Sequence, residues 1–209
     1  TGYGLVDGRP IYAVAQDFTV AGGAVGEATA KKISDLQDNA MKTGDPNVFI
    51  NDSGGARIQE GVGSLAGYGD IFNRNILASG VVPQISVISG PCAGGAAYSP
   101  ALTDFIIQVR HEGPMYITGP SVIKQVTGED VTAEQLGGVE SHSHYSRVVH
   151  FVAESGGDGL EIAKRLLSFL PSNNTDDPPF YEELHDDVVA PNIALNTIVP
   201  DNPREAYDM

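Results

Sequence analysis

Apolar and polar residues form alternating blocks along the chain, and these blocks predict strands and helices in turn. Short, nearly continuous apolar runs are typical of buried strands, and they lie at 47–52, 81–89, 104–109 and 115–117. Apolar residues three or four positions apart predict helices at about 25–43, 59–79, 96–103 and 159–170. Strands followed by helices predict an α/β architecture with largely parallel strands.

Glycine residues mark turns and helix ends in this pattern, and a change in charge marks a domain boundary. Asp7-Gly8 is a strong turn signal and predicts a β-hairpin over about 4–17, whereas Gly44 and Gly80 are natural helix stops. After Pro171 the chain becomes acidic. We therefore expect a globular domain over 1–172 and an acidic arm or linker over 173–209.

The charge of the chain bears on its partners. The 209 residues carry a formal net charge of −15, and residues 173–209 hold nine acidic side chains and one basic side chain. This balance argues against nucleic acid or an anionic membrane as the main partner. A phosphate-bearing ligand is still possible, because a few local cations and backbone N–H groups can hold one.

Cysteine content and the termini bear on the compartment. Cys92 is the single cysteine, so the chain has no intramolecular disulfide and no cysteine-based metal cluster. We find no signal peptide and no apolar run of about 18 residues, and we expect a cytoplasmic or mitochondrial-matrix protein without membrane insertion. The chain begins at Thr1 without Met, and we expect it to be part of a longer polypeptide.

Two glycine pairs, Gly54-Gly55 and Gly94-Gly95, each follow an apolar run and precede a predicted helix. Paired glycines allow positive φ and a close approach of the backbone to a ligand, and the N–H groups that open the next helix can face negative charge. Two such donors would form an oxyanion hole, in which the loss of one donor costs about 3 to 4 kcal/mol of barrier. Tight strand-to-helix packing requires the same turns, so the sequence alone leaves both interpretations open.

Other catalytic arrangements have weaker signals. No Gly-x-Ser-x-Gly elbow and no P-loop ending is present, and Cys92 is more typical of a small buried residue than of a nucleophile. His142, His144 and His150 do not have the spacing of a zinc motif, so packing or surface roles are favoured over metal ligation. We predict no metal site.

Several long motifs resemble the carboxyltransferase (beta) subunits of biotin-dependent acyl-CoA carboxylases, and they cover nearly the whole chain in order. The matching segments are 16–20, 51–61, 78–86, 90–100, 117–120, 126–130, 134–138 and 170–174. This family includes propionyl-CoA carboxylase, methylmalonyl-CoA carboxyltransferase and methylmalonyl-CoA decarboxylase, and the chain resembles its amino-terminal half.

The resemblance implies a crotonase-like fold, a superhelix of repeated ββα units. It also implies transfer of a carboxyl group between carboxybiotin and the α-carbon of a short acyl-CoA, with propionyl-CoA expected, through an enolate held by backbone N–H groups. In this reading Gly94 and Gly95 are catalytic. The residues expected to bind acyl-CoA are Ser53, Gly54, Gly55, Ala56, Arg57, Ala93 and Ala96. A Gly95→Val substitution is then expected to abolish transfer and leave the fold intact.

The resemblance also implies partners and exposes departures from the family. The expected partners are a biotin carboxyl carrier and a biotin carboxylase subunit, and we expect a dimer-based homo-oligomer, a hexamer by analogy. The biotin-facing glycine turn of the family lies in a second half, so this chain alone is expected to be inactive. Where the family commonly has Ser-Gly-Val-Ala-His, this chain has 146–150 with Arg147 at the glycine position, which could alter packing or a ligand contact.

Three rival functions remain. A decarboxylase subunit of a sodium-pumping complex would run the transfer in the opposite direction. A crotonase-like hydratase or isomerase would need paired glutamates beside a glycine turn, and Glu60 stands alone there. A non-catalytic assembly subunit would be expected to lack the glycine pairs, and both are present.

Overall fold

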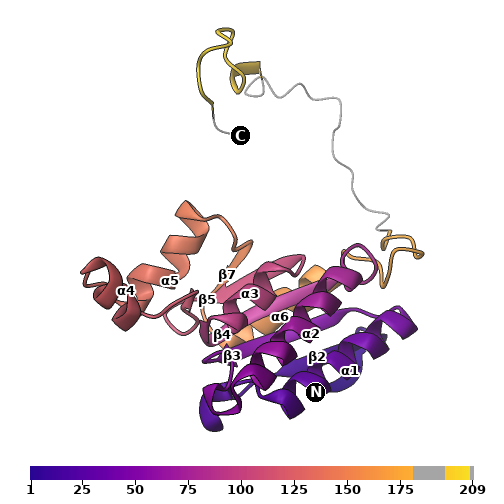
Figure 1. Cartoon of the computed structure of the whole chain (residues 1–209). Helices are drawn as coiled ribbons and strands as arrows, with labels where there is room; N and C mark the ends of the chain where they lie inside the picture. Colours follow the sequence, from indigo (N-terminus) through magenta and orange to yellow (C-terminus); the bar gives the residue numbers. More distant parts are fainter. Residues whose placement is uncertain (181–195, 208–209) are drawn as a thin grey trace. The chain divides into compact units, whose positions relative to one another are not determined.

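The parallel strands of one sheet end along a common edge, and this edge is where the glycine pairs lie. The computed structural model describes residues 1–180 and 196–207, and the sheet lies in the first compact unit, Thr1–Pro179 (Figure 1). Its seven strands are β1 (Gly2–Val6), β2 (Arg9–Ala15), β3 (Asn47–Ser53), β4 (Gln84–Ala93), β5 (Phe105–Val109), β6 (Met115–Tyr116) and β7 (Phe151–Ala153). They pair in the order β1-β2-β3-β4-β5-β7, and β6 pairs with the end of β4. Only β1 and β2 of these strands are antiparallel, which confirms the predicted α/β architecture.

Helices follow the strands in sequence, and α1, α3 and α6 pack directly on the sheet. Those described are α1 (Glu27–Thr43), α2 (Val62–Ala78), α3 (Gly95–Ala101), α4 (Pro120–Thr127), α5 (Ala133–Gly137) and α6 (Gly156–Leu167). The predicted hairpin is confirmed, with positive φ at both Asp7 and Gly8. Gly44 ends α1 in the left-handed conformation, as expected of a helix stop.

Some predicted helix bounds were wrong. The helix expected from residue 59 begins at Val62, after a single 3₁₀ turn at Ile58–Glu60. The helix expected over 159–170 runs from Gly156 to Leu167, because the Ser155 side chain accepts a hydrogen bond from the Asp158 N–H and starts the helix earlier. The pattern also did not predict α4, whose Gly119-Pro120 start resembles a turn although proline is favoured at the first helical position.

The alternation of side chains along β3 separates two cores. Phe49 packs with residues of α1 and α2 such as Ile33 and Ile71. Val48, its neighbour, faces the other side of the sheet and packs with Ala163 of α6. Successive strand residues point to opposite faces, so β3 is buried on both faces, which explains its continuous apolar run.

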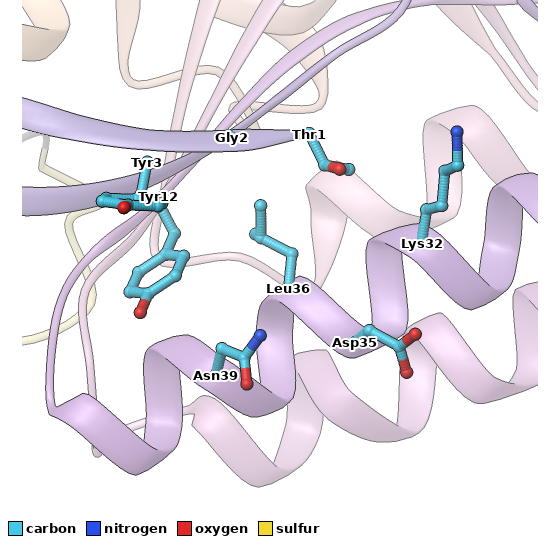
Figure 2. Close-up of a pocket in the computed structure, with 8 residues that line it drawn as sticks. All are labelled: Thr1, Gly2, Tyr3, Tyr12, Lys32, Asp35, Leu36 and Asn39. Atoms are coloured by element: carbon cyan, nitrogen blue, oxygen red, sulfur yellow. The ribbon is translucent and has the colours of Figure 1, made fainter.

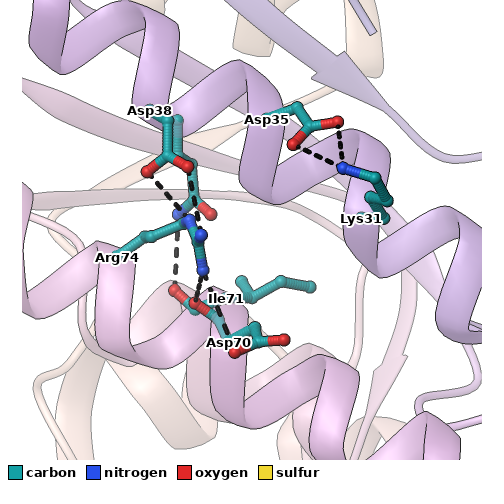
Figure 3. Close-up of polar contacts among 7 residues, drawn as sticks. Lys31, Asp35, Asp38, Asp70, Ile71 and Arg74 are labelled. Carbon is teal, nitrogen blue, oxygen red and sulfur yellow. Dashed lines mark hydrogen bonds and ion pairs between the residues drawn. The ribbon is translucent and has the colours of Figure 1, made fainter.

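Helices α1 and α2 are joined by charge as well as by apolar packing (Figure 3). The Arg74 guanidinium donates to both carboxylate oxygens of Asp38, at 2.9 Å from Nε and 3.0 Å from Nη2, and to the Asp70 carbonyl at 3.1 Å. A two-point arginine–carboxylate contact fixes geometry better than a single ion pair does. This contact holds α2 in register with α1.

The first unit extends beyond residue 172, where we expect the arm to begin. Asn174 donates its N–H to the Val81 carbonyl, and the Asn173 side chain donates to the Gly44 carbonyl, both at 2.9 Å. The second unit is Phe180–Met209, within which the Arg204 N–H donates to the Asn202 side chain at 3.1 Å. The part of the expected arm over 181–195 lies outside the described residues.

Candidate functional site

The register of β3 and β4 places the two glycine pairs side by side. Ser53 pairs with Cys92 in parallel strands, so the chain leaves the sheet at the same edge in both cases. A Cβ added at Gly55 would lie 2.5 Å from the Ala93 carbonyl oxygen and 3.8 Å from the Gly95 nitrogen. The two turns therefore form one site, although their sequence separation gives no sign of it.

The N–H groups of the first pair are used within its own loop. Gly54 donates to the Gly22 carbonyl at 2.8 Å, and Gly55 donates to the Ser53 hydroxyl at 3.1 Å. The Ser53 hydroxyl in turn donates to the Gly23 carbonyl at 2.7 Å. This loop is therefore a fixed wall of the site, and its two glycine N–H groups already have acceptors.

The second pair presents donors. Gly94 has φ +56° and donates its own N–H to the Tyr116 carbonyl at 3.1 Å. Gly95 and Ala96 are the first two residues of α3, where N–H groups have no acceptor within the helix. A Cβ at Gly94 would lie 3.9 Å from the nearest neighbouring atom, the Ile117 carbonyl oxygen, so a ligand can approach this turn. The geometry favours Gly95 and Ala96 as the donor pair, one residue later than Gly94 and Gly95.

The residues after Gly55 hold α1. Ala56 forms a parallel bridge with Val25, and the half-exposed Arg57 forms an ion pair with Glu60 at 3.6 Å. The Glu60 carboxylate accepts the N–H of Glu27, the first residue of α1, at 2.7 Å. Glu60 therefore serves as a helix cap, which weakens further the hydratase or isomerase interpretation that needs it as a base.

Cys92 lies beneath the glycine pairs and has no solvent-exposed surface. Burial raises the pKa of its thiol to about 12. Because the thiolate is the nucleophile, a thiol with so high a pKa is a packing residue at neutral pH.

The three histidines make separate contacts. His142 lies 2.6 Å from the Met115 carbonyl through Nε2 and 2.8 Å from the Ser146 hydroxyl through Nδ1; a carbonyl only accepts, so we assign the proton to Nε2. His144 pairs with Glu140, and His150 accepts the Ile106 N–H. In the described part of the chain no group of three or more His, Cys, Asp or Glu side chains is placed to hold a metal ion.

An apolar cavity of about 540 Å³ lies beside α3. Its walls come from α3, β6, α4, α5 and the segment before β7, and they include Ala97, Tyr98, Met115, Ile117, Ile123, Leu136 and Val148. Arg147, next to the cavity-lining Val148, has φ +55°, the conformation that favours the glycine found in the resembling family. The sequence pattern did not predict this cavity, because α4 and α5 were not predicted.

A second hollow, of about 300 Å³, lies between the amino-terminal hairpin and α1 (Figure 2). The hairpin contributes Tyr3 and Tyr12 to its lining, and α1 contributes Lys32, Asp35 and Leu36. No residue of α3 or β6, the elements next to Gly94-Gly95, is part of its lining, so we do not assign the site to it.

Comparison with known proteins gives a consistent result. The carboxyl transferase domain model matches residues 1–209. Over 209 residues the chain is 59% identical to methylmalonyl-CoA decarboxylase subunit alpha of Veillonella parvula, covering 100% of this chain and 41% of that protein. It is 54% identical to the propionyl-CoA carboxylase beta chain of Roseobacter denitrificans, again covering 100% of this chain and 41% of the relative. The chain thus spans about 41% of the length of these two relatives.

Solved structures agree. A structure of transcarboxylase 12S, described as a hexamer with hydrolysed methylmalonyl-coenzyme A bound, has a TM-score of 0.86 at 55% identity, covering 99% of this chain and 40% of the other. The beta subunit of geranyl-CoA carboxylase from P. aeruginosa has a TM-score of 0.74 at 29% identity, covering 99% and 39%. These matches confirm the expected crotonase-like fold. In the two described stretches no helix has the length and apolarity needed to cross a bilayer.

Proposed function

Because the chain belongs to the carboxyl transferase domain family, we propose that it is the acyl-CoA-binding half of a biotin-dependent acyl-CoA carboxyltransferase. The observation that carries this proposal is the start of α3, where Gly95 and Ala96 offer two N–H groups beside an accessible Gly94. Two donors at the thioester oxygen stabilise the negative charge that develops there when the α-carbon loses its proton. Donors fixed in a folded backbone need little reorganisation during the reaction.

The residues around Gly95 fit an acyl thioester. Gly55 lacks a side chain at the point where a Cβ would lie 3.8 Å from the Gly95 nitrogen, so it keeps that donor accessible. Ser53 fixes the loop that carries Gly55, and the small Ala93 and Ala96 flank the glycine pair. We assign Gly54, Ala56 and the half-exposed Arg57 to the coenzyme A side of the same site.

Carboxybiotin, when bound, would supply the carboxyl group. Its ureido nitrogen would be able to take the α-proton once the bond from that nitrogen to the carboxyl group has broken. The new carbon–carbon bond would then form between the α-carbon and the released carboxyl carbon. Glu60 caps α1 and Cys92 is buried, so neither supplies a free acid or base beside the glycine pairs. The role of this chain is therefore to bind the thioester and hold its oxygen. We assign the biotin-side contacts to a second half of the polypeptide, as the family resemblance implies.

The cavity and the relatives support the substrate that we propose and two directions of transfer. The apolar cavity beside α3 supports a short acyl group, and propionyl-CoA with its carboxylated product is the pair we propose. A second candidate is the decarboxylase direction in a sodium-pumping complex, because methylmalonyl-CoA decarboxylase subunits of Veillonella parvula and Propionigenium modestum are 59% and 57% identical to the chain.

The partners we propose are a biotin carboxyl carrier and either a biotin carboxylase subunit or a membrane pump. We also propose a homo-oligomer, by analogy with the transcarboxylase 12S hexamer, that works in the cytoplasm or the mitochondrial matrix.

A carboxyl-exchange assay of the full-length assembly tests this function. Labelled carboxyl groups should move between the biotinylated carrier and propionyl-CoA faster than to acetyl-CoA. An assembly that carries labelled carboxybiotin and transfers it to neither thioester would contradict the proposal. Identifying whether a carboxylase or a membrane pump co-purifies separates the two directions.

Substitution of Gly95 sharpens the assay. A Cβ at this position would lie 2.8 Å from three ring carbons of Tyr68, so Gly95→Val must also displace that ring. This changes our expectation that the variant would leave the fold intact, and the unfolding midpoint has to be measured with the transfer rate. Gly69→Val, at an exposed glycine of α2 with no atom within 4 Å of an added Cβ, is the matched control.

A further inference from the structure

One face of α2 contacts α3 at successive positions. Tyr68, Phe72 and Asn75 are four and three residues apart, so they share a face of the helix. The Tyr68 ring lies against Gly95, and the Phe72 ring meets the Tyr98 ring edge-on with centroids 6.2 Å apart. The third contact is the Ser99 hydroxyl, which donates to the Asn75 side-chain oxygen at 3.0 Å. Helix α3 is therefore held by α2 from its first turn to its second.

At the Asn75 end of this contact, buried hydrogen bonds link Asn75, Gln84 and Ser99. The Gln84 amide nitrogen donates to the Asn75 carbonyl at 2.9 Å, so the Gln84 oxygen faces the Asn75 side chain. That oxygen accepts from the Asn75 amide nitrogen at 3.0 Å, which leaves the Asn75 oxygen to accept from Ser99. Both amides are fully buried. A satisfied buried network of this kind has a single arrangement, and it anchors α3 to the start of β4.

The near end of the contact is Tyr68, which is 5% exposed. Its hydroxyl lies near the Ser53 hydroxyl, which donates to the Gly23 carbonyl and accepts from the Gly55 N–H. The side chain lines a small cavity of about 20 Å³ together with the polar Gln16, Asn51 and Ser99. Such a space holds about one water molecule and suits a buried hydroxyl. Tyr68 therefore has its ring against Gly95 and its hydroxyl among polar groups behind the site.

We infer that Tyr68 is a positioning residue, whose ring sets the placement of the Gly95 and Ala96 N–H groups at the start of α3. The inference rests on the proposed function, because the placement matters only if these groups bind the thioester oxygen. It also explains why residue 95 is glycine although its φ is not in the left-handed region: a Cβ there would lie 2.8 Å from the Tyr68 ring carbons. The ring occupies the space that a side chain at position 95 would need.

Kinetics of the full-length assembly test this role. Tyr68→Phe keeps the ring, and its kcat should stay within about twofold of wild type, whereas Tyr68→Leu should lower kcat more than about tenfold and change KM less than about threefold. Rates are taken per folded active assembly, with Tyr145→Leu, at an exposed tyrosine, as the control for the same substitution. Unchanged kcat in Tyr68→Leu, or a change confined to KM, would overturn the inference.

A stability cycle tests the contact without any need for activity. Gly95→Ala should lower the urea unfolding midpoint in the wild-type background, and the decrease should be about half as large or less in a Tyr68→Ala background. Equal decreases in both backgrounds would overturn the contact itself. If the wild-type assembly transfers no carboxyl group, the proposed function fails, and this cycle still reports separately on Tyr68 and Gly95.

Discussion

Glu60 distinguishes two enzyme classes, since a hydratase would use it as a base and a carboxyltransferase would not. Its carboxylate accepts the N–H of Glu27 at 2.7 Å and lies 3.6 Å from the Arg57 guanidinium. Loss of a side-chain cap costs about 0.5 to 2 kcal/mol, and a partly exposed ion pair contributes about 0.2 to 1 kcal/mol. We therefore expect Glu60→Ala to lower the free energy of unfolding by about 1 to 2 kcal/mol and to leave kcat nearly unchanged.

A graded series measures the two contributions of Glu60. Glu60→Gln keeps an oxygen that can accept from Glu27 and loses only the charge near the helix start, so its loss should be about 0.3 to 1 kcal/mol. Glu161→Gln is the control, because Glu161 is an exposed partner of Lys164 at 2.6 Å and caps no helix. Urea unfolding followed by circular dichroism measures the stability, and carboxyl exchange measures the rate.

The result that would refute this reasoning is a loss of activity without a loss of stability. If Glu60→Gln unfolded at the wild-type urea concentration and lost more than about a hundredfold in kcat, Glu60 would be acting in the chemistry. The hydratase or isomerase interpretation would then regain support.

Three further predictions follow from single residues. Arg147→Gly should raise the free energy of unfolding by about 0.5 to 1 kcal/mol, because removing the backbone strain at φ +55° outweighs the added conformational freedom of the unfolded chain. A lower urea unfolding midpoint in this variant would count against the prediction. Burial raises the pKa of the Cys92 thiol from 9.0 to about 12. Below about pH 9 the thiol is neutral in both the folded and the unfolded chain, so it should not make stability depend on pH. Between about pH 9 and pH 12 only the unfolded chain loses this proton, so the free energy of unfolding should fall by about 1.4 kcal/mol per pH unit. Urea unfolding at several pH values should show that part of the slope vanishing in Cys92→Ala. Gly55→Ala, with φ +96° and a Cβ 2.5 Å from the Ala93 carbonyl, should lower the unfolding midpoint and the exchange rate, whereas Gly54→Ala, whose Cβ meets nothing nearer than 3.4 Å, should have a much smaller effect.

Most of the fold could be predicted from local sequence patterns, whereas most of the site depends on contacts between residues far apart in the sequence. The apolar runs at β3 and β4 and the stop at Gly44 could be identified from the sequence, because each depends on neighbouring residues. The meeting of Gly55 with Ala93 depends on the register of two strands, and the bond from Gly94 to the Tyr116 carbonyl depends on β6 returning to β4. Neither of these two contacts can be predicted from the spacing of the glycines in the sequence.

A non-local contact also bears on which N–H groups we propose as donors. The family resemblance assigns the oxyanion hole to Gly94 and Gly95, whereas the hydrogen bond from Gly94 to Tyr116 leaves Gly95 and Ala96 as the pair at the helix start. The contact of Tyr68 with Gly95 is equally hidden in the sequence, since 27 positions separate the two residues. Only the packing of α2 on α3 reveals why a glycine stands at position 95.

The vibrational spectrum of a bound thioester tests the central claim most directly. Isotope-edited infrared spectroscopy of carbonyl-labelled propionyl-CoA, bound to the full-length enzyme, reports hydrogen bonding to the thioester oxygen. If the N–H groups of Gly95 and Ala96 donate to that oxygen, its stretching band should lie at lower frequency than in free propionyl-CoA and move back towards the free value in Tyr68→Leu. A bound thioester whose band stays at the free frequency in the wild-type enzyme would contradict the account.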